Sequence, residues 1–201
     1  MNSIDCITLE VADTTAAERF YEAAFGLGDL VRVRASDAAT TGFRGFTLSL
    51  VVSQPSTVNG LIDSAVAAGA ATLKSAEKSL WGYGGVVQAP DGTIWQLVTS
   101  AKKDTGPDAR TIDEVVLLLG AGDVGASKRF YVDRGLTVGK GFGNYVDFSM
   151  PSSPVGLGLY KRRALAKVAG VDAEGSGSHR LVINGGAEPF TDPDGFAWEP
   201  A

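Results

Sequence analysis

The chain has 201 residues, of which 44% are hydrophobic and 20% are charged, and its net charge is −5 at pH 7. This composition is typical of a globular protein with a sizeable core, and the acidic balance argues against the broad basic face that nucleic-acid binding requires. A single cysteine excludes an intramolecular disulfide, and no apolar run reaches the roughly 18 residues of a membrane span. Because the N-terminus also lacks a signal-peptide pattern, we expect a cytoplasmic protein that binds neither nucleic acid nor a membrane.

Two halves of the sequence carry the same three blocks in the same order. A β-branched stretch that begins with Ile-Asp at residue 4 recurs at residue 112, and Arg-Phe-Tyr at residue 19 recurs at residue 129. Pro-Asp-Gly-x-x-Trp at residue 90 recurs at residue 193. Such self-similarity indicates an internal duplication. The predicted modules are residues 1–100 and 111–201, joined by a polar, turn-rich linker at 101–110.

Each predicted module runs in the order strand, helix, strands, short helix and closing strand. Asp13 and Asp123 can cap the first helix of each copy by accepting backbone N–H bonds, and Gly26 and Gly135 suit its end. In copy one, the predicted strands are 4–11, 43–52 and 93–98, and the predicted helices are 16–25 and 58–68. In copy two, the predicted strands are 112–119, 144–150, 155–160 and 196–199, and the predicted helices are 125–134 and 163–169.

This order, with Phe-Tyr in the first helix and Pro-Asp-Gly-x-x-Trp followed by Gln or Glu, resembles the vicinal oxygen chelate superfamily. That group contains glyoxalases, bleomycin resistance proteins and extradiol dioxygenases. The resemblance implies an α+β fold in which two tandem βαβββ modules form curled mixed sheets around a shared concave cavity, with helices on the convex side. It also implies metal ligands in the first and last strands, at the positions of Cys6, Gln96, Glu114 and Glu199.

The alternation of side chains along a strand supports the same positions. Period-two alternation puts Trp95 and Trp198 in the core, and Gln96 and Glu199 on the opposite face. The other side chains that we expect to bind a ligand in the cavity are Thr8, Thr47, Ser49, Tyr145, Asp147 and Ser149, with Trp81 and Tyr83 at its mouth.

The residue types at the four metal positions leave metal binding open. The first-strand His of the family is replaced by Cys6 and Glu114, and the one histidine, His179, matches none of the positions and is expected in an exposed loop. A 2-His-1-carboxylate iron site cannot form from one chain, which argues against dioxygenase chemistry. Either a cation balances the carboxylates, or they are protonated, separated or solvated. We favour the interpretation without a metal or other cofactor.

The sequence supports two functions from different classes. The favoured one is a glyoxalase/bleomycin-resistance-like protein that binds a small aromatic or amphipathic molecule in the inter-module cavity. The alternative is a metal-dependent lyase or isomerase in which Gln96, Glu114 and Glu199 hold nickel, zinc or manganese. In that alternative Glu199 or Glu114 is the catalytic residue that moves the proton. A scaffold protein without a small ligand is a third hypothesis. Because two modules in one chain can complete the cavity, both a monomer and a homodimer are compatible with the sequence.

Overall fold

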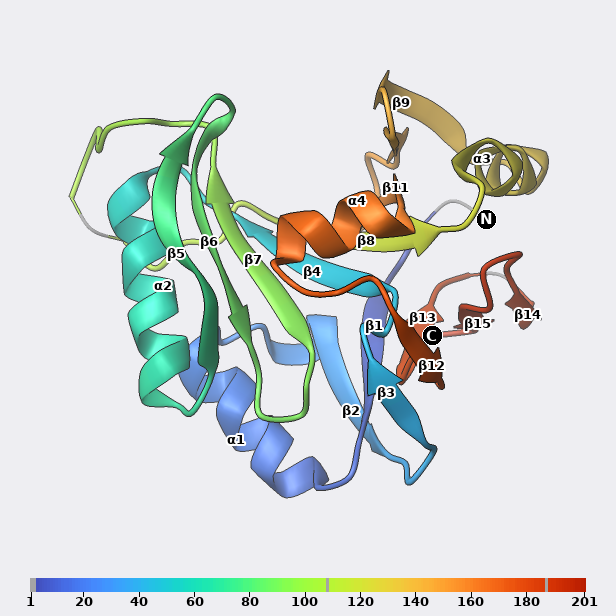
Figure 1. The fold of residues 1–201 in the computed structure, drawn as a ribbon, viewed down its shortest axis with the longest axis horizontal. Helices are drawn as coiled ribbons and strands as arrows, with labels where there is room; N and C mark the ends of the chain where they lie inside the picture. The colour runs from blue at the N-terminus through green and yellow to red at the C-terminus, as the bar shows by residue number, and fades with distance from the viewer. Residues whose placement is uncertain (1–2, 108, 187) are drawn as a thin grey trace.

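The structure is a computed structural model that describes residues 3–107, 109–186 and 188–201 (Figure 1). Asp108, in the predicted linker, lies outside the described residues. The described helices are α1 (Thr14–Ala24), α2 (Pro55–Ala67), α3 (Val124–Asp133) and α4 (Arg162–Ala169), with a short 3-10 helix at Gly28–Leu30. The strands of copy one are β1 (Cys6–Val11), β2 (Val31–Ala35), β3 (Thr40–Gly42), β4 (Phe46–Val51), β5 (Ala71–Ser79), β6 (Gly82–Gln88) and β7 (Ile94–Thr99). The strands of copy two are β8 (Glu114–Ala121), β9 (Thr137–Phe142), β10 (Tyr145–Ser149), β11 (Val155–Lys161), β12 (Gly175–Gly177), β13 (Leu181–Asn184), β14 (Phe190–Thr191) and β15 (Ala197–Glu199).

The first helix of each copy has the predicted ends. The Asp13 carboxylate accepts from the Ala16 backbone N–H, and the Asp123 carboxylate accepts from the N–H groups of Gly125 and Ala126. Gly26 and Gly135, after the helix ends, have positive φ angles of 62° and 95°. A residue without a Cβ adopts this backbone conformation at little cost, so these short signals fix where both helices begin and end.

The two main sheets each combine strands from both copies. The eight-stranded sheet has the order β5-β6-β7-β4-β8-β11-β10-β9, and the five-stranded sheet has the order β14-β15-β13-β1-β2. Antiparallel pairs β4–β8 and β1–β13 join the copies, and β3 and β12 form a further two-stranded sheet. Each sheet face therefore displays residues from both halves of the sequence. The α+β class and the curled mixed sheets expected from the sequence are confirmed.

The main core lies between the sheets and helices α1, α2 and α3. Trp95 and Trp198 are 0% and 1% exposed, as the alternation predicted. The first helix of each copy is also tied to the turn before the last strand, because the Tyr21 hydroxyl donates to Asp91 Oδ2 and the Tyr131 hydroxyl donates to Asp192 Oδ2. In copy one this bond links the Phe-Tyr and Pro-Asp-Gly blocks directly; in copy two Asp192 directly precedes Pro-Asp-Gly, whose Asp194 instead accepts from the Ser127 hydroxyl of α3. No helix among the described residues is long and apolar enough to cross a membrane.

Helix α4 packs on the other face of the eight-stranded sheet. Its buried side chains Leu165, Ala166 and Ala169 form a second, smaller cluster with side chains of the sheet, including Val86, Ile94 and Leu118. These three alternate along their strands with residues of the main core, such as Val87, Trp95 and Leu117, so the two clusters lie on opposite faces. The expectation that helices cover the convex side is therefore corrected for α4.

Two basic side chains fasten α4 in this position. Arg162, at its start, donates to the carbonyl oxygens of Phe43 and Ala173. Lys74, on the edge strand β5, donates through Nζ to the carbonyl oxygens of Lys167 and Val168 at 2.7 Å each. A cation near the last carbonyl groups of a helix also interacts favourably with its dipole. The edge strand β5 and the distant strand β11 both contact this one short helix. Because several strands separate β5 from β11, the sheet must curl around α4.

Candidate functional site

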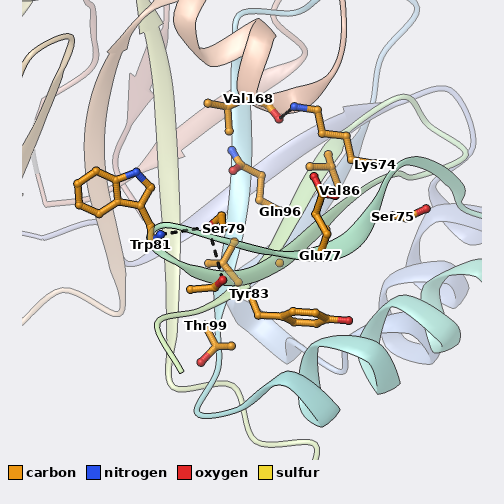
Figure 2. A pocket seen from close by; sticks show the side chains of 14 residues that line it. Lys74, Ser75, Glu77, Ser79, Trp81, Tyr83, Val86, Gln96, Thr99 and Val168 are labelled. Carbon is orange, nitrogen blue, oxygen red and sulfur yellow. Dashed lines mark hydrogen bonds between the residues drawn. The ribbon is translucent and has the colours of Figure 1, made fainter. Parts of the chain in front are cut away.

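A cavity of about 250 Å³ lies beside α4 on the concave face of the eight-stranded sheet (Figure 2). Its floor comes from β5, β6 and β7, where Val86 is paired with Gln96, and Gly84 with Val98. Val168 of α4 borders one side, and Trp81, in the turn between β5 and β6, borders another. The cavity therefore has an apolar wall, one buried amide and an aromatic ring at its edge.

Gln96 is the predicted metal-position residue that lines this cavity. It is 6% exposed, and its Nε2 donates to Thr47 Oγ1 at 2.7 Å. That bond fixes the orientation of the amide. Its carbonyl oxygen has no hydrogen-bond partner among the described residues, so it can accept a hydrogen bond from a molecule in the cavity.

The two aromatic residues predicted at the mouth have different surroundings. Trp81 is 75% exposed, and its ring centroid lies 6.3 Å from that of Phe142, the last residue of β9. Tyr83 contributes to the cavity wall, but its ring is turned toward α2, where its hydroxyl donates to Asn59 Oδ1 (Figure 2). Trp81 is thus the better placed of the two to stack on a ligand.

The remaining predicted residues of this sheet face do not line the cavity. Thr47 and Ser49 are buried, and Glu114 lies on β8, beyond β4 from Gln96. Tyr145 packs on Tyr160 at a centroid distance of 4.8 Å, next to the cluster beneath α4. Burial, together with the neighbouring Asp147 carboxylate, raises the pKa of the Tyr145 hydroxyl. The other two polar residues of this edge are Asp147, which accepts from the Lys140 backbone N–H, and Ser149, which is exposed on β10.

The five-stranded sheet holds the other two metal-position residues. Cys6 is buried opposite Asn184, which in turn is opposite Glu199. Burial raises the pKa of the Cys6 thiol. Thr8 donates to Asn184 Oδ1 at 2.7 Å, so its hydroxyl is already engaged within the sheet.

An arginine that the sequence analysis did not single out contacts Glu199. Arg34, on β2, lies 3.1 Å from Glu199 Oε2 through Nη1 and 2.7 Å from Glu10 Oε1 through Nη2. These three residues border a separate polar cavity of about 330 Å³. The alternation Val31-Arg32-Val33-Arg34 was the available signal, since it indicates a strand with both arginines on one face.

The donor set does not fit a divalent metal site. Gln96 and Glu114 lie on one sheet, whereas Cys6 and Glu199 lie on the other. In residues 3–107, 109–186 and 188–201, no three His, Cys, Asp or Glu side chains are grouped so that they could hold an ion. The Gln96 amide is held by Thr47, and the Glu199 carboxylate is held by Arg34. Of the possibilities left open by the sequence, the carboxylates are separated, and at Glu199 the balancing charge is a guanidinium.

The histidine also differs from its sequence-based interpretation. His179 is partly buried rather than exposed, and its ring stacks on Phe196 at a centroid distance of 4.0 Å. Its Nδ1 lies 2.5 Å from the Arg44 carbonyl oxygen, and its Nε2 lies 3.1 Å from the Asp194 carbonyl oxygen. Because these groups come from both copies, His179 connects the copies structurally.

No protein-family model matches the chain, and no curated relative matches it either. Several solved structures, in contrast, are similar to this chain. Glyoxalase I from Zea mays superposes with a TM-score of 0.64 at 16% identity, over 98% of this chain and 90% of that chain. A mutant of the same enzyme gives 0.64 at 15% identity, over 98% and 92%. A putative dioxygenase from Bacillus subtilis gives 0.62 at 10% identity, over 98% and 84%. The chain therefore has the vicinal oxygen chelate fold in a two-module arrangement, as the sequence resemblance predicted. At these identities the similarity establishes the fold alone.

Proposed function

We propose that this protein binds a small aromatic or amphipathic molecule, without a metal, in the cavity bounded by Gln96, Val98 and Trp81. The observation that supports this function best is the combination of a largely apolar wall with one buried amide and one exposed indole. Small-molecule sites are commonly apolar hollows with a few polar groups that orient the ligand. The indole offers a stacking surface, and the amide oxygen offers a hydrogen-bond acceptor.

The size and charge of the cavity narrow the ligand class. About 250 Å³ is the volume share of roughly eight water molecules in the liquid, which suits a molecule of one or two rings. Val86, Val98 and Val168 would cover the apolar part. Glu77 also lines the cavity and forms no ion pair within the described part of the chain. Lys74 lines the cavity as well, but its Nζ already donates to carbonyl oxygens of α4, so Glu77 is the charged side chain that remains to accept from an N–H-bearing group of the ligand.

The metal-dependent lyase or isomerase is the competing proposal. It requires Gln96, Glu114 and Glu199 to act together, and the described residues do not assemble that donor set. We therefore derive no catalytic step from Glu199 or Glu114. Metal analysis of protein purified without chelator tests this competing proposal. A stoichiometric ion that is lost in a Glu114→Gln, Glu199→Gln double variant would overturn the metal-free proposal.

Ligand binding can be tested through the fluorescence of Trp81. The other two tryptophans are buried, so a small panel of planar aromatic amines should change mainly the emission of Trp81. We expect saturable quenching in the wild type and at least a tenfold weaker affinity, measured by calorimetry, in Trp81→Ala and in Gln96→Leu.

The matched control is Leu80→Ala. Leu80 is in the same turn and similarly exposed, but it does not line the cavity, so this variant should bind like the wild type. Equal affinities in Trp81→Ala, Gln96→Leu and the wild type would show that any binding occurs elsewhere. No saturable binding by any member of the panel would contradict the proposed ligand class.

A further inference from the structure

The ion-paired group on the five-stranded sheet joins three strands and both copies. Glu10 is on β1, Arg34 is opposite it on β2, and Glu199 is on β15, which lies two strands beyond β1. The Arg34 and Glu199 side chains nevertheless approach to 3.1 Å, so the sheet curls and brings its two sides toward one point. The Arg34 side chain is 45% exposed and the Glu199 side chain 41%, so the group borders the polar cavity rather than the core.

The contacts of Arg34 use the oxygen atoms that a metal ion would need. Its Nη1 donates to Glu199 Oε2, and its Nη2 donates to Glu10 Oε1. Two carboxylates that face one cavity repel each other unless a positive charge lies between them. A guanidinium supplies that charge permanently, and its planar fork suits carboxylate oxygens. Hydrogen bonds to Glu10 and Glu199 raise the pKa of Arg34 further. The chain itself thus supplies one positive charge between the two carboxylates, which halves their negative charge.

We infer that Arg34 occupies the cation position between Glu10 and Glu199 and thereby closes this site to divalent metal ions. Its positive charge repels an approaching cation, and its N–H groups already use the carboxylate oxygens. Arg34 is thus the residue that keeps divalent metal ions from binding to Glu10 and Glu199 on the five-stranded sheet. The inference does not depend on ligand binding at the eight-stranded sheet, because the two cavities share no lining residues.

Removal of the Arg34 guanidinium should create a binding site for a divalent ion. In Arg34→Ala, Glu10 and Glu199 lose their balancing charge and become available to a hard divalent ion, which prefers oxygen ligands. Titration with Mn²⁺, followed by electron paramagnetic resonance of the free ion, measures this directly. We expect Arg34→Ala to bind one Mn²⁺ at least tenfold more tightly than the wild type. The Arg34→Ala, Glu199→Gln double variant should lose that gain.

Arg32→Ala is the matched control. Arg32 is on the same strand and the same face, two residues away, but it forms no ion pair with Glu10 or Glu199 within the described residues. It removes the same charge, and its Mn²⁺ affinity should stay within about twofold of the wild type. If both single variants gained equally, the gain would come from net charge and the inference would be wrong.

Two further outcomes would overturn the inference. One is Arg34→Ala that is folded by circular dichroism but binds Mn²⁺ no better than the wild type. The other is a wild-type protein that already binds a divalent ion through Glu199. If Arg34→Ala does not fold, Arg34→Met is measured in its place, because it keeps the aliphatic stem and removes only the charged head.

Discussion

Helices α2 and α4 have the same place in the two sequence copies but pack on opposite faces of the eight-stranded sheet (Figure 1). The longer α2 (Pro55–Ala67) contributes Val58, Leu61 and Ala65 to the main core, beside α1. The shorter α4 (Arg162–Ala169) directly succeeds β11 and places Leu165 against the concave face. The difference shows that an inherited position in a repeat does not fix the face on which a helix packs.

The two copies also differ in the segment that comes after this helix. Copy one continues with the long hairpin of β5 and β6, whereas copy two continues with the three-residue strand β12, which pairs with β3. Helix α4 therefore covers the part of the concave face next to β8 and β11, and the uncovered part lies over β5, β6 and β7. The divergence of the copies leaves a small cavity beside α4, built mainly by copy one.

The largest expected effect comes from truncating the central leucine of each helix. Leu61 and Leu165 are both fully buried, and a buried Leu→Ala change typically lowers the free energy of unfolding by about 2–5 kcal/mol. We expect about 3–4 kcal/mol for Leu61→Ala. For Leu165→Ala we expect about 2 kcal/mol, because its cluster is smaller and a short helix can settle onto the sheet. Urea unfolding followed by circular dichroism measures both.

Val66→Ala and Val168→Ala are the matched surface controls, since both side chains are partly exposed on the same two helices. Each should change the free energy of unfolding much less than its leucine partner. If Leu165→Ala lowered the free energy of unfolding as much as Leu61→Ala does, the packing of α4 would contribute as much to stability as that of α2, and this comparison of the two helices would be wrong.

An intermediate effect is expected where the copies share a tyrosine-to-carboxylate bond. The Tyr131 hydroxyl donates to Asp192 at 2.6 Å and also accepts from Trp198 Nε1 at 3.2 Å. In copy one the carboxylate comes from a different position of the repeat, the Asp of Pro-Asp-Gly, and Asp91 Oδ2 accepts from both the Tyr21 hydroxyl and Thr93 Oγ1. Tyr131→Phe leaves a buried indole N–H without its acceptor, so we expect it to lower the free energy of unfolding by about 2 kcal/mol. For Tyr21→Phe we expect a decrease of about 1 kcal/mol. Thermal unfolding compares them, and equal losses would show that the indole bond adds nothing.

The smallest effect is a pH dependence that comes from one buried carboxyl of copy two. Burial raises the pKa of the Asp192 carboxyl above its usual value near 4. The folded protein therefore binds this proton more tightly than the unfolded chain does, and the free energy of unfolding falls as pH rises from about 4 through the raised pKa. Asp192→Asn should remove this dependence of the free energy of unfolding on pH. The change in free energy across this pH range should be smaller than the decrease caused by Tyr131→Phe. Asp37→Asn, which removes an exposed carboxyl, should leave the profile unchanged.

Local sequence patterns predicted the strands with a long apolar run and missed the exposed edge strands, together with the buried but glycine-rich β6. Strands β1, β4, β7 and β8 alternate or run apolar, and they lie close to their predicted ranges. Strands β5 and β9 were not predicted, because Lys74, Lys78 and Lys140 fall in sequences that are exposed along most of their length. An edge strand of this kind carries little apolar signal, since neighbouring backbone rather than a core holds it in place.

The candidate site was only partly predictable for a related reason. Gln96 and Trp81 border one cavity, and the alternation of β7 and the glycine-rich turn pointed to both. Glu114 and Glu199 were assigned to the same cavity, but they lie on different sheets. Period-two alternation gives the face of a strand and does not say which other strands share its sheet.

The sequence by itself determined the duplication, the capped first helices and the buried positions of Trp95 and Trp198, because each depends on neighbours close along the chain. The tertiary structure decided the pairing of β4 with β8, the concave position of α4 and the contact of Arg34 with Glu199. Arg34 and Glu199 are 165 residues apart, and only the curl of a sheet built from both copies brings them together. The sequence of each copy thus specifies its own helices and strands, whereas the pairing of strands between the copies sets the charge and size of each cavity.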